Sequence, residues 1–134
     1  MQQHHQHYSC HTRKWIALLL AAAVTLLAGC GDKIASVRFK VNSEPEGAYV
    51  VYQMSGSKTP CAGEWIYLGN TPLQGVHKFS REQLENSDKI TLKVMQPGYV
   101  DQKKDWDGDS FYEEAEDKGV IYWTPEMIPV GSQQ

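Results

Sequence analysis

The chain has few of the residues from which catalytic and metal sites are usually built. It contains three cysteines and five histidines in 134 residues, and four of the histidines fall within the first eleven positions. The sequence contains no glycine-rich phosphate loop, so a nucleotide site lacks its parts. The closely spaced His and Cys residues of the first eleven positions lie within the leader that is predicted below, so we do not expect them to form a metal site in the mature protein. Basic residues are also outnumbered, 13 against 16 acidic ones. Because phosphate neutralisation needs clustered Lys and Arg, nucleic-acid binding is not expected.

The longest apolar run is too short to cross a bilayer. Residues 15–28 are apolar or small apart from Thr25, and Arg13 and Lys14 precede them directly. A spanning helix needs about 20 such residues. A cationic segment, a short apolar stretch and small residues, in this order, are typical of a secretory signal. We therefore predict a cleaved leader over residues 1–29; the alternative is a buried core helix followed by a free cysteine.

The end of this run resembles the lipobox of bacterial lipoprotein precursors, because it reads Leu27-Ala28-Gly29-Cys30. The resemblance implies that the leader is removed before Cys30 and that Cys30 then carries acyl chains such as palmitate. Several chains attach a protein to a membrane much more firmly than one. Residues 30–34 are then a tether. In such lipoproteins an Asp directly after the Cys favours the inner membrane. Here Gly31 follows, which favours the outer membrane, at its periplasmic face or at the cell surface.

Without the leader, the chain retains one histidine, His77, and one cysteine besides Cys30, which is Cys61. Two of the 13 basic residues are lost with the leader, which leaves 11 against 16 acidic ones and a net charge of about −5. The remaining residues suffice for one small domain. For Cys61 a buried apolar role, a free thiol and an intermolecular disulfide all stay open. A catalytic Cys61–His77 pair lacks an orienting group and an oxyanion site in the sequence.

The rest of the pattern is that of β-strands. Apolar and polar residues alternate, or apolar residues cluster, in segments that predict strands at 35–41, 48–54, 64–68, 89–96 and 119–123. Ser80 and Gln83 have the spacing of a helix capping box, which predicts one short helix within 79–86. We therefore expect a mainly β fold, a small antiparallel β-sandwich-like domain with one short helix.

Three turn-forming stretches lie between these strands: residues 43–50 (SEPEGAYV), 68–73 (LGNTPL) and 94–99 (VMQPGY). In this order they resemble the three signatures of PEGA domains, whose Pro-Glu-Gly-Ala motif stands at 45–48. The resemblance covers about residues 35–100 and implies a PEGA-type domain in the cell envelope, with carbohydrate or protein partners. The chain departs from the family in a longer loop at 55–63 and in the helical pattern at 79–86.

Residues 101–118 predict an acidic loop, followed by a final strand and tail at 119–134. The spacing of its oxygen donors matches that of an EF-hand calcium loop, in which ligand positions 1, 3, 5, 7, 9 and 12 would be Asp105, Asp107, Asp109, the Phe111 carbonyl, Glu113 and Glu116. Against this, Ser110 stands where the sharp turn requires Gly, and the flanks look like strands. A solvated acidic connector is the alternative.

Aromatic residues are numerous for a small domain. Tyr67 and Trp123 lie in predicted strands and are expected to be buried. Trp106 lies among Lys and Asp residues and is expected to be exposed, where it could stack on a sugar ring or form a protein hot spot. As candidate binding residues the sequence offers Trp65, Trp106 and Tyr112.

Together these patterns predict a lipid-anchored, non-catalytic binding module of the cell envelope with a protein or carbohydrate partner. We expect no resident cofactor. The alternative is a calcium-binding structural lipoprotein with the metal at 105–116. A small envelope enzyme is the third possibility, but paired carboxylates need a rigid cleft that so short a chain can scarcely build.

Overall fold

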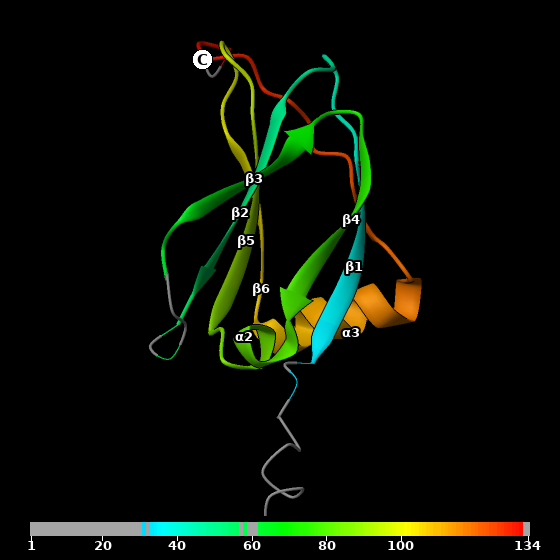
Figure 1. Ribbon diagram of the computed structural model, residues 1–134. Coiled ribbons are helices and arrows are strands. Elements are labelled where there is room, and N and C mark those ends of the chain that lie inside the picture. Colours follow the sequence, from blue (N-terminus) through cyan, green and yellow to red (C-terminus); the bar gives the residue numbers. More distant parts are fainter. Residues whose placement is uncertain (1–30, 32, 57, 59–61, 133–134) are drawn as a thin grey trace, which may run out of the picture. The chain divides into compact units, whose positions relative to one another are not determined.

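The computed structural model describes residues 31, 33–56, 58 and 62–132, and those from 33 onward form one compact unit. Two β-sheets pack face to face as a sandwich, with helices at one end (Figure 1). The mainly β, sandwich-like fold predicted from the sequence is thus confirmed. The predicted leader at 1–29, the lipidation site Cys30, and Cys61 lie outside the described residues.

The first sheet, sheet A, has the strand order β4-β1-β7. Its strands are β1 (Ile34–Val41), β4 (Leu73–Ser80) and β7 (Ile121–Trp123). β1 runs antiparallel to β4 and parallel to β7. The second sheet, sheet B, is antiparallel throughout, with the order β3 (Trp65–Asn70), β2 (Tyr49–Ser55), β5 (Lys89–Met95) and β6 (Gln102–Trp106). As predicted for 48–54, β2 is an interior strand.

Alternating side chains make the core between the sheets. In β1 every second residue is buried and the others are exposed, as the period of two in its sequence requires. The inward residues of β2 and β5 meet those of β1; Val50, Leu92 and Val94 are fully buried. Burying such a side chain contributes about 1.5–3 kcal/mol. The core is therefore apolar and continuous from one sheet to the other.

Two helices lie at the end of the sandwich where β1 begins (Figure 1). The first, α2 (Arg81–Glu85), is the predicted short helix, and its N-cap Ser80 accepts a hydrogen bond from the Gln83 N–H. The second, α3 (Gly108–Lys118), begins at the cap Asp107 and ends at Gly119. α3 buries Phe111 in the core, where its ring lies 5.7 Å from that of Phe79 and 5.4 Å from that of Trp106.

The prediction of an acidic loop at 101–118 is wrong, because this segment forms β6 and α3. β6 pairs with β5, and β7 pairs with β1, so residues beyond 100 complete both sheets and the β domain does not end there. Strand β4 was also not expected from the sequence. In the described part of the chain, no helix has the length and apolar character needed to span a bilayer.

Buried hydroxyl groups join two turns at the opposite end of the sandwich. Ser43 and Thr71 lie 2.5 Å apart through their side-chain oxygens, and the Ala48 N–H donates to Thr71 Oγ1 at 3.0 Å. Backbone hydrogen bonds from Gly47 N–H to the Thr71 carbonyl and from Thr71 N–H to the Ala48 carbonyl complete the connection. Gly47 has φ = 92°, which favours glycine. The first two stretches that resemble PEGA signatures are therefore bonded to each other.

The substitution Thr71→Val tests this connection. It keeps the shape of the side chain but leaves the buried Ala48 N–H without its side-chain acceptor and removes one of the two partners of the Ser43 hydroxyl, which also donates to the Pro45 carbonyl. We therefore expect a loss of about 1–3 kcal/mol in the free energy of unfolding. Denaturant unfolding of the purified protein measures it. Thr124→Val is the control, because the exposed Thr124 hydroxyl bonds only to the exposed Tyr122 hydroxyl. Equal losses in the two variants would contradict the prediction.

Candidate functional site

The outer face of sheet B carries three exposed aromatic side chains, Tyr49, Trp65 and Tyr67, which we call the aromatic platform. Their exposed fractions are 48%, 40% and 57%, respectively. Tyr49 comes from β2 and the other two come from β3, and the rings of Tyr49 and Tyr67 lie 6.4 Å apart at an angle of 53°. Strand alternation turns these residues outward because Val50, Tyr52 and Met54 of β2 face the core.

Below the platform lies Val51, which is only 7% exposed although it faces outward from the sheet. Its direct neighbours across the strands are Tyr67 on β3 and Lys93 on β5. The Lys93 ammonium lies 4.0 Å from the centre of the Trp65 ring and 3.8 Å from the Asp101 carboxylate. Such a cation–π contact stabilises by about 0.5–1 kcal/mol at exposed sites. Lys93 therefore holds the Trp65 ring while its aliphatic stem lies beside Val51.

An irregularity in β3 aligns Tyr67 with the turn described above. The β2–β3 register shifts between Val50 and Val51, so Leu68 has no direct partner in β2. Because of this β-bulge, Tyr67 and Asn70 lie on the same face. The Tyr67 hydroxyl donates to Asn70 Oδ1, and Asn70 Nδ2 donates to the Gly47 carbonyl at 2.9 Å. The turn around Gly47 therefore fixes the orientation of an exposed aromatic ring.

Chemically, the platform is suited to binding. Rings held on a sheet present flat apolar faces with polar groups at their edges, which is the surface used for stacking and for protein hot spots. A contiguous exposed apolar patch on a small soluble domain is a sign of an interaction site.

Of the three candidate binding residues, only Trp65 belongs to the platform. The expectation that Trp106 is exposed is wrong: it is 9% exposed and its indole N–H donates to Glu114 Oε2 at 2.6 Å. It faces inward from β6, and α3 covers it. Tyr112 lies on α3, with the Arg81 guanidinium 4.8 Å from its ring.

Tyr67 and Tyr49 are the platform residues that sequence reasoning missed. The expectation that Tyr67 is buried is wrong, because β3 is an edge strand in which no residue is buried. Tyr49 had a readable signal, since the apolar Val50, Tyr52 and Met54 occupy one face of the same strand. The bulge that brings Asn70 beside Tyr67 has no signal in the sequence.

The six predicted calcium ligands are distributed over a strand and a helix. Asp105 on β6 accepts from Thr91 and pairs with Lys89 at 2.8 Å, and these hydrogen bonds hold its pKa below the usual value. Asp107 caps α3 by accepting the Ser110 N–H at 2.8 Å, which lowers its pKa. The remaining four lie within α3, namely Asp109, Phe111, Glu113 and Glu116. The loop conformation expected here is therefore absent, because an EF-hand site needs a turning chain and this one is helical.

Among the described residues, no three Asp, Glu, His or Cys side chains are grouped so that they could hold a metal ion. Among the carboxylates that form ion pairs in the described chain, Glu114 is the most shielded from solvent, and it accepts hydrogen bonds from Trp106, Lys104 and Lys118. Burial alone would raise its pKa, but the hydrogen bonds from Trp106 and Lys118 hold the pKa of Glu114 below the usual value. Its contacts are those of a structural link between β6 and α3.

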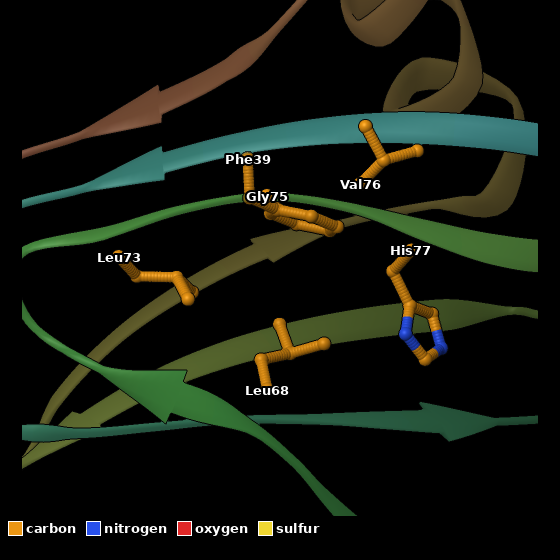
Figure 2. A pocket seen from close by; sticks show the side chains of 6 residues that line it. All are labelled: Phe39, Leu68, Leu73, Gly75, Val76 and His77. Carbon is orange, nitrogen blue, oxygen red and sulfur yellow. The ribbon is translucent and has the colours of Figure 1, made fainter.

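A small cavity lies between the edge strands β3 and β4. It has a volume of about 60 Å³ and is lined by Phe39, Leu68, Leu73, Gly75, Val76 and His77. Figure 2 shows Leu68, Leu73 and His77 around this space, whereas Val76 points to the other side of β4. Gly75 contributes no side chain, and a Cβ added there would meet nothing within 4 Å. Ligand sites usually measure about 300–1,000 Å³, so this cavity is a gap in the packing.

His77 lines the cavity and lies 3.0 Å from the Tyr52 hydroxyl through Nε2. Its ring also makes an edge contact with Phe79, at 4.8 Å. Burial lowers the pKa of His77 and raises the pKa of Tyr52. Both groups are thus kept neutral near pH 7, as expected for a polar pair at the margin of a core.

This burial predicts a loss of stability in mild acid. The folded-state pKa of His77 lies below the unfolded value of about 6.5, so the unfolded chain takes up a proton first. Stability therefore falls as the pH decreases through about 6.5 towards the folded-state pKa. His77→Gln keeps a polar group near Tyr52 but does not titrate. We expect the melting temperature of the wild type to fall relative to that of His77→Gln as the pH decreases from about 7.5 to about 5. A constant difference over this range would contradict the prediction.

Compared with known proteins, the chain matches no protein-family model, no curated protein and no solved structure. The PEGA-type domain and the lipidation at Cys30 therefore stay predictions, which rest on the sequence stretches that resemble the PEGA signatures and the lipobox.

Proposed function

We propose that the protein is a lipid-anchored, non-catalytic binding module of the bacterial cell envelope, which holds a carbohydrate or protein partner on the aromatic platform. The single observation that carries this proposal is the platform itself: Tyr49, Trp65 and Tyr67 are exposed together on one face of a sheet. Lys93 and Asn70 hold two of the three rings in place.

Preorganisation makes the platform effective. A side chain that is already held in its bound orientation loses little conformational entropy when a ligand arrives. Trp65 is stacked under Lys93, and Tyr67 is hydrogen-bonded to Asn70, which is bonded in turn to the Gly47 carbonyl. Tyr and Trp also present large contact areas with few rotatable bonds.

A non-catalytic role is supported by the surroundings of the one histidine outside the predicted leader. His77 contacts Tyr52 and Phe79 rather than a nucleophile in an open cleft. The raised pKa of Tyr52 makes its hydroxyl a poor nucleophile. For the alternative, a calcium-binding structural lipoprotein, the described residues give no supporting observation, because Asp105 and Asp107 already bond to protein groups.

Envelope location and the lipid anchor rest on residues 13–30, and the PEGA-type assignment rests on the three turn stretches. The first two of these stretches support a common motif because they bond to each other through Ser43, Thr71 and Ala48. A connection of this kind gives a physical reason for the two stretches to occur together.

The substitution Trp65→Ala tests the platform. We expect it to weaken partner binding about 30-fold or more, the loss associated with a hot-spot aromatic. Detergent-solubilised protein is titrated against isolated cell-wall polysaccharide and, separately, cross-linked to its neighbours in intact cells. Ile66→Ala is the matched control, since Ile66 is an exposed apolar residue of the same strand and lies on the opposite side of β3 from Trp65. Partners retained equally by the wild type and by the double variant Trp65→Ala/Tyr67→Ala would contradict the proposal.

A further inference from the structure

The outer face of sheet A carries positive charge and no carboxylate. Arg38 and Lys40 of β1 and Lys78 of β4 are exposed on it, and we call these three residues the cationic face. The other outward residues of these strands and of β7 are uncharged: Ile34, Ser36, Gln74, Val76, Ser80 and Tyr122. The chain as a whole has more acidic than basic residues, so a face that carries only positive charge differs clearly from the rest of the surface.

Ion pairing makes the contrast sharper. Five cations of the described chain pair with carboxylates, and all lie on sheet B or on the helices: Arg81, Lys89, Lys93, Lys104 and Lys118. Within the described residues, Arg38, Lys40 and Lys78 have no carboxylate partner; Lys40 lies 5.9 Å from the Tyr122 ring instead. The positive charge of the cationic face is therefore available to a ligand outside the domain.

Exposed apolar side chains are interleaved with these cations. Ile34, Val76 and Tyr122 are between 52% and 64% exposed. Val76 lies directly opposite Arg38, and Tyr122 directly opposite Lys40. Cations that alternate with aliphatic and tyrosine side chains form the kind of surface that binds at a membrane interface, where charged ends meet headgroups and apolar parts enter between them.

We propose that the cationic face lies against an anionic lipid surface, with Lys40, Arg38 and Lys78 on phosphate-bearing headgroups and Ile34, Val76 and Tyr122 at the interface. This inference rests on the lipid anchor of the proposed function. Only three residues lie between Cys30 and Ile34, so the two are four residue steps apart. An extended chain covers at most about 3.6 Å per step, so the start of β1 stays within roughly 15 Å of the acylated residue.

Charge also decides which side of the domain faces the bilayer. The helical end also lies near the start of β1, where the Arg81 N–H donates to the Lys33 carbonyl. However, α2 and α3 together have seven Asp and Glu residues against one Arg and one Lys. An anionic surface repels this end and attracts the cationic face. Each Lys or Arg near such a surface strengthens binding by roughly fivefold, so three strengthen it by roughly 100-fold. The aromatic platform, on the opposite sheet, then faces away from the membrane.

The full-length acylated protein, reconstituted into vesicles, tests the orientation. Reaction of lysines with an acetylating reagent, read by mass spectrometry, is compared in phosphatidylcholine vesicles and in vesicles that contain about 30% phosphatidylglycerol. We expect the reactivity of Lys40 and Lys78 to fall severalfold in the anionic vesicles, whereas that of Lys103, on the outer face of sheet B, stays the same. Protection should be lost at high salt, because screening removes it. If the reactivity of Lys40 and Lys78 is the same in neutral and anionic vesicles, the proposal is overturned.

Flotation separates this inference from the proposed function. Protein that floats with neutral vesicles is anchored by its lipid, whatever the pattern of lysine acetylation shows. If the protein does not float with neutral vesicles, the anchor fails, and the cationic face is then judged by flotation with anionic vesicles alone. There, Arg38→Gln/Lys40→Gln/Lys78→Gln should lower binding roughly 100-fold relative to the charge-matched control Lys58→Gln/Lys103→Gln/Lys118→Gln. Equal binding by the two triple variants, or protection of Lys40 by soluble heparin but not by anionic vesicles, overturns the proposal.

Discussion

The hydrogen bonds between Ser43, Thr71 and Ala48 are the constraint on which the rest of the structure depends. Thr71 directly follows β3 and bonds to Ala48, which directly precedes β2, so these bonds extend the edge of sheet B. Ser43 follows β1 of sheet A, so its bond to Thr71 connects the two sheets at one end of the sandwich. Ser43 and Thr71 are both buried in the folded protein. Buried polar groups without partners cost about 1–3 kcal/mol each, so this arrangement tolerates few alternatives. The same turn holds Asn70 and, through it, the Tyr67 ring.

The two outer faces of the sandwich differ in chemistry, and this difference connects the two proposals. Sheet B presents aromatic rings and pairs most of its charges, whereas sheet A presents unpaired cations and scattered apolar side chains. Alternation in β1 and β2 produces both faces from one physical rule, because each strand must bury every second side chain between the sheets. What remains outside is free to differ, and here it differs strongly.

Much of the fold could be predicted from the sequence, because its strands β1, β2, β3, β5 and β7 carry apolar runs or clear alternation. β4 was missed because Gly75 and His77 occupy inward positions where an apolar residue would have shown the period. β6 was missed because it is a charged edge strand, which natural sheets protect in this way. α3 was mistaken for a loop because its acidic residues obscured the cap at Asp107, the buried Phe111 and the terminal Gly119. The platform depended on tertiary pairing, which alternation within one strand cannot supply.

Strand β3 carries two of the three platform rings and has a hydrogen-bonded neighbour on one side only. It is six residues long and has an irregular register, so its detachment from β2 requires less free energy than opening the core. A ligand that contacts Trp65 and Tyr49 at once connects two strands and opposes this fraying. Its apparent affinity is therefore linked to the local unfolding equilibrium of an edge strand, and a substitution that loosens β3 can weaken recognition without touching any ring.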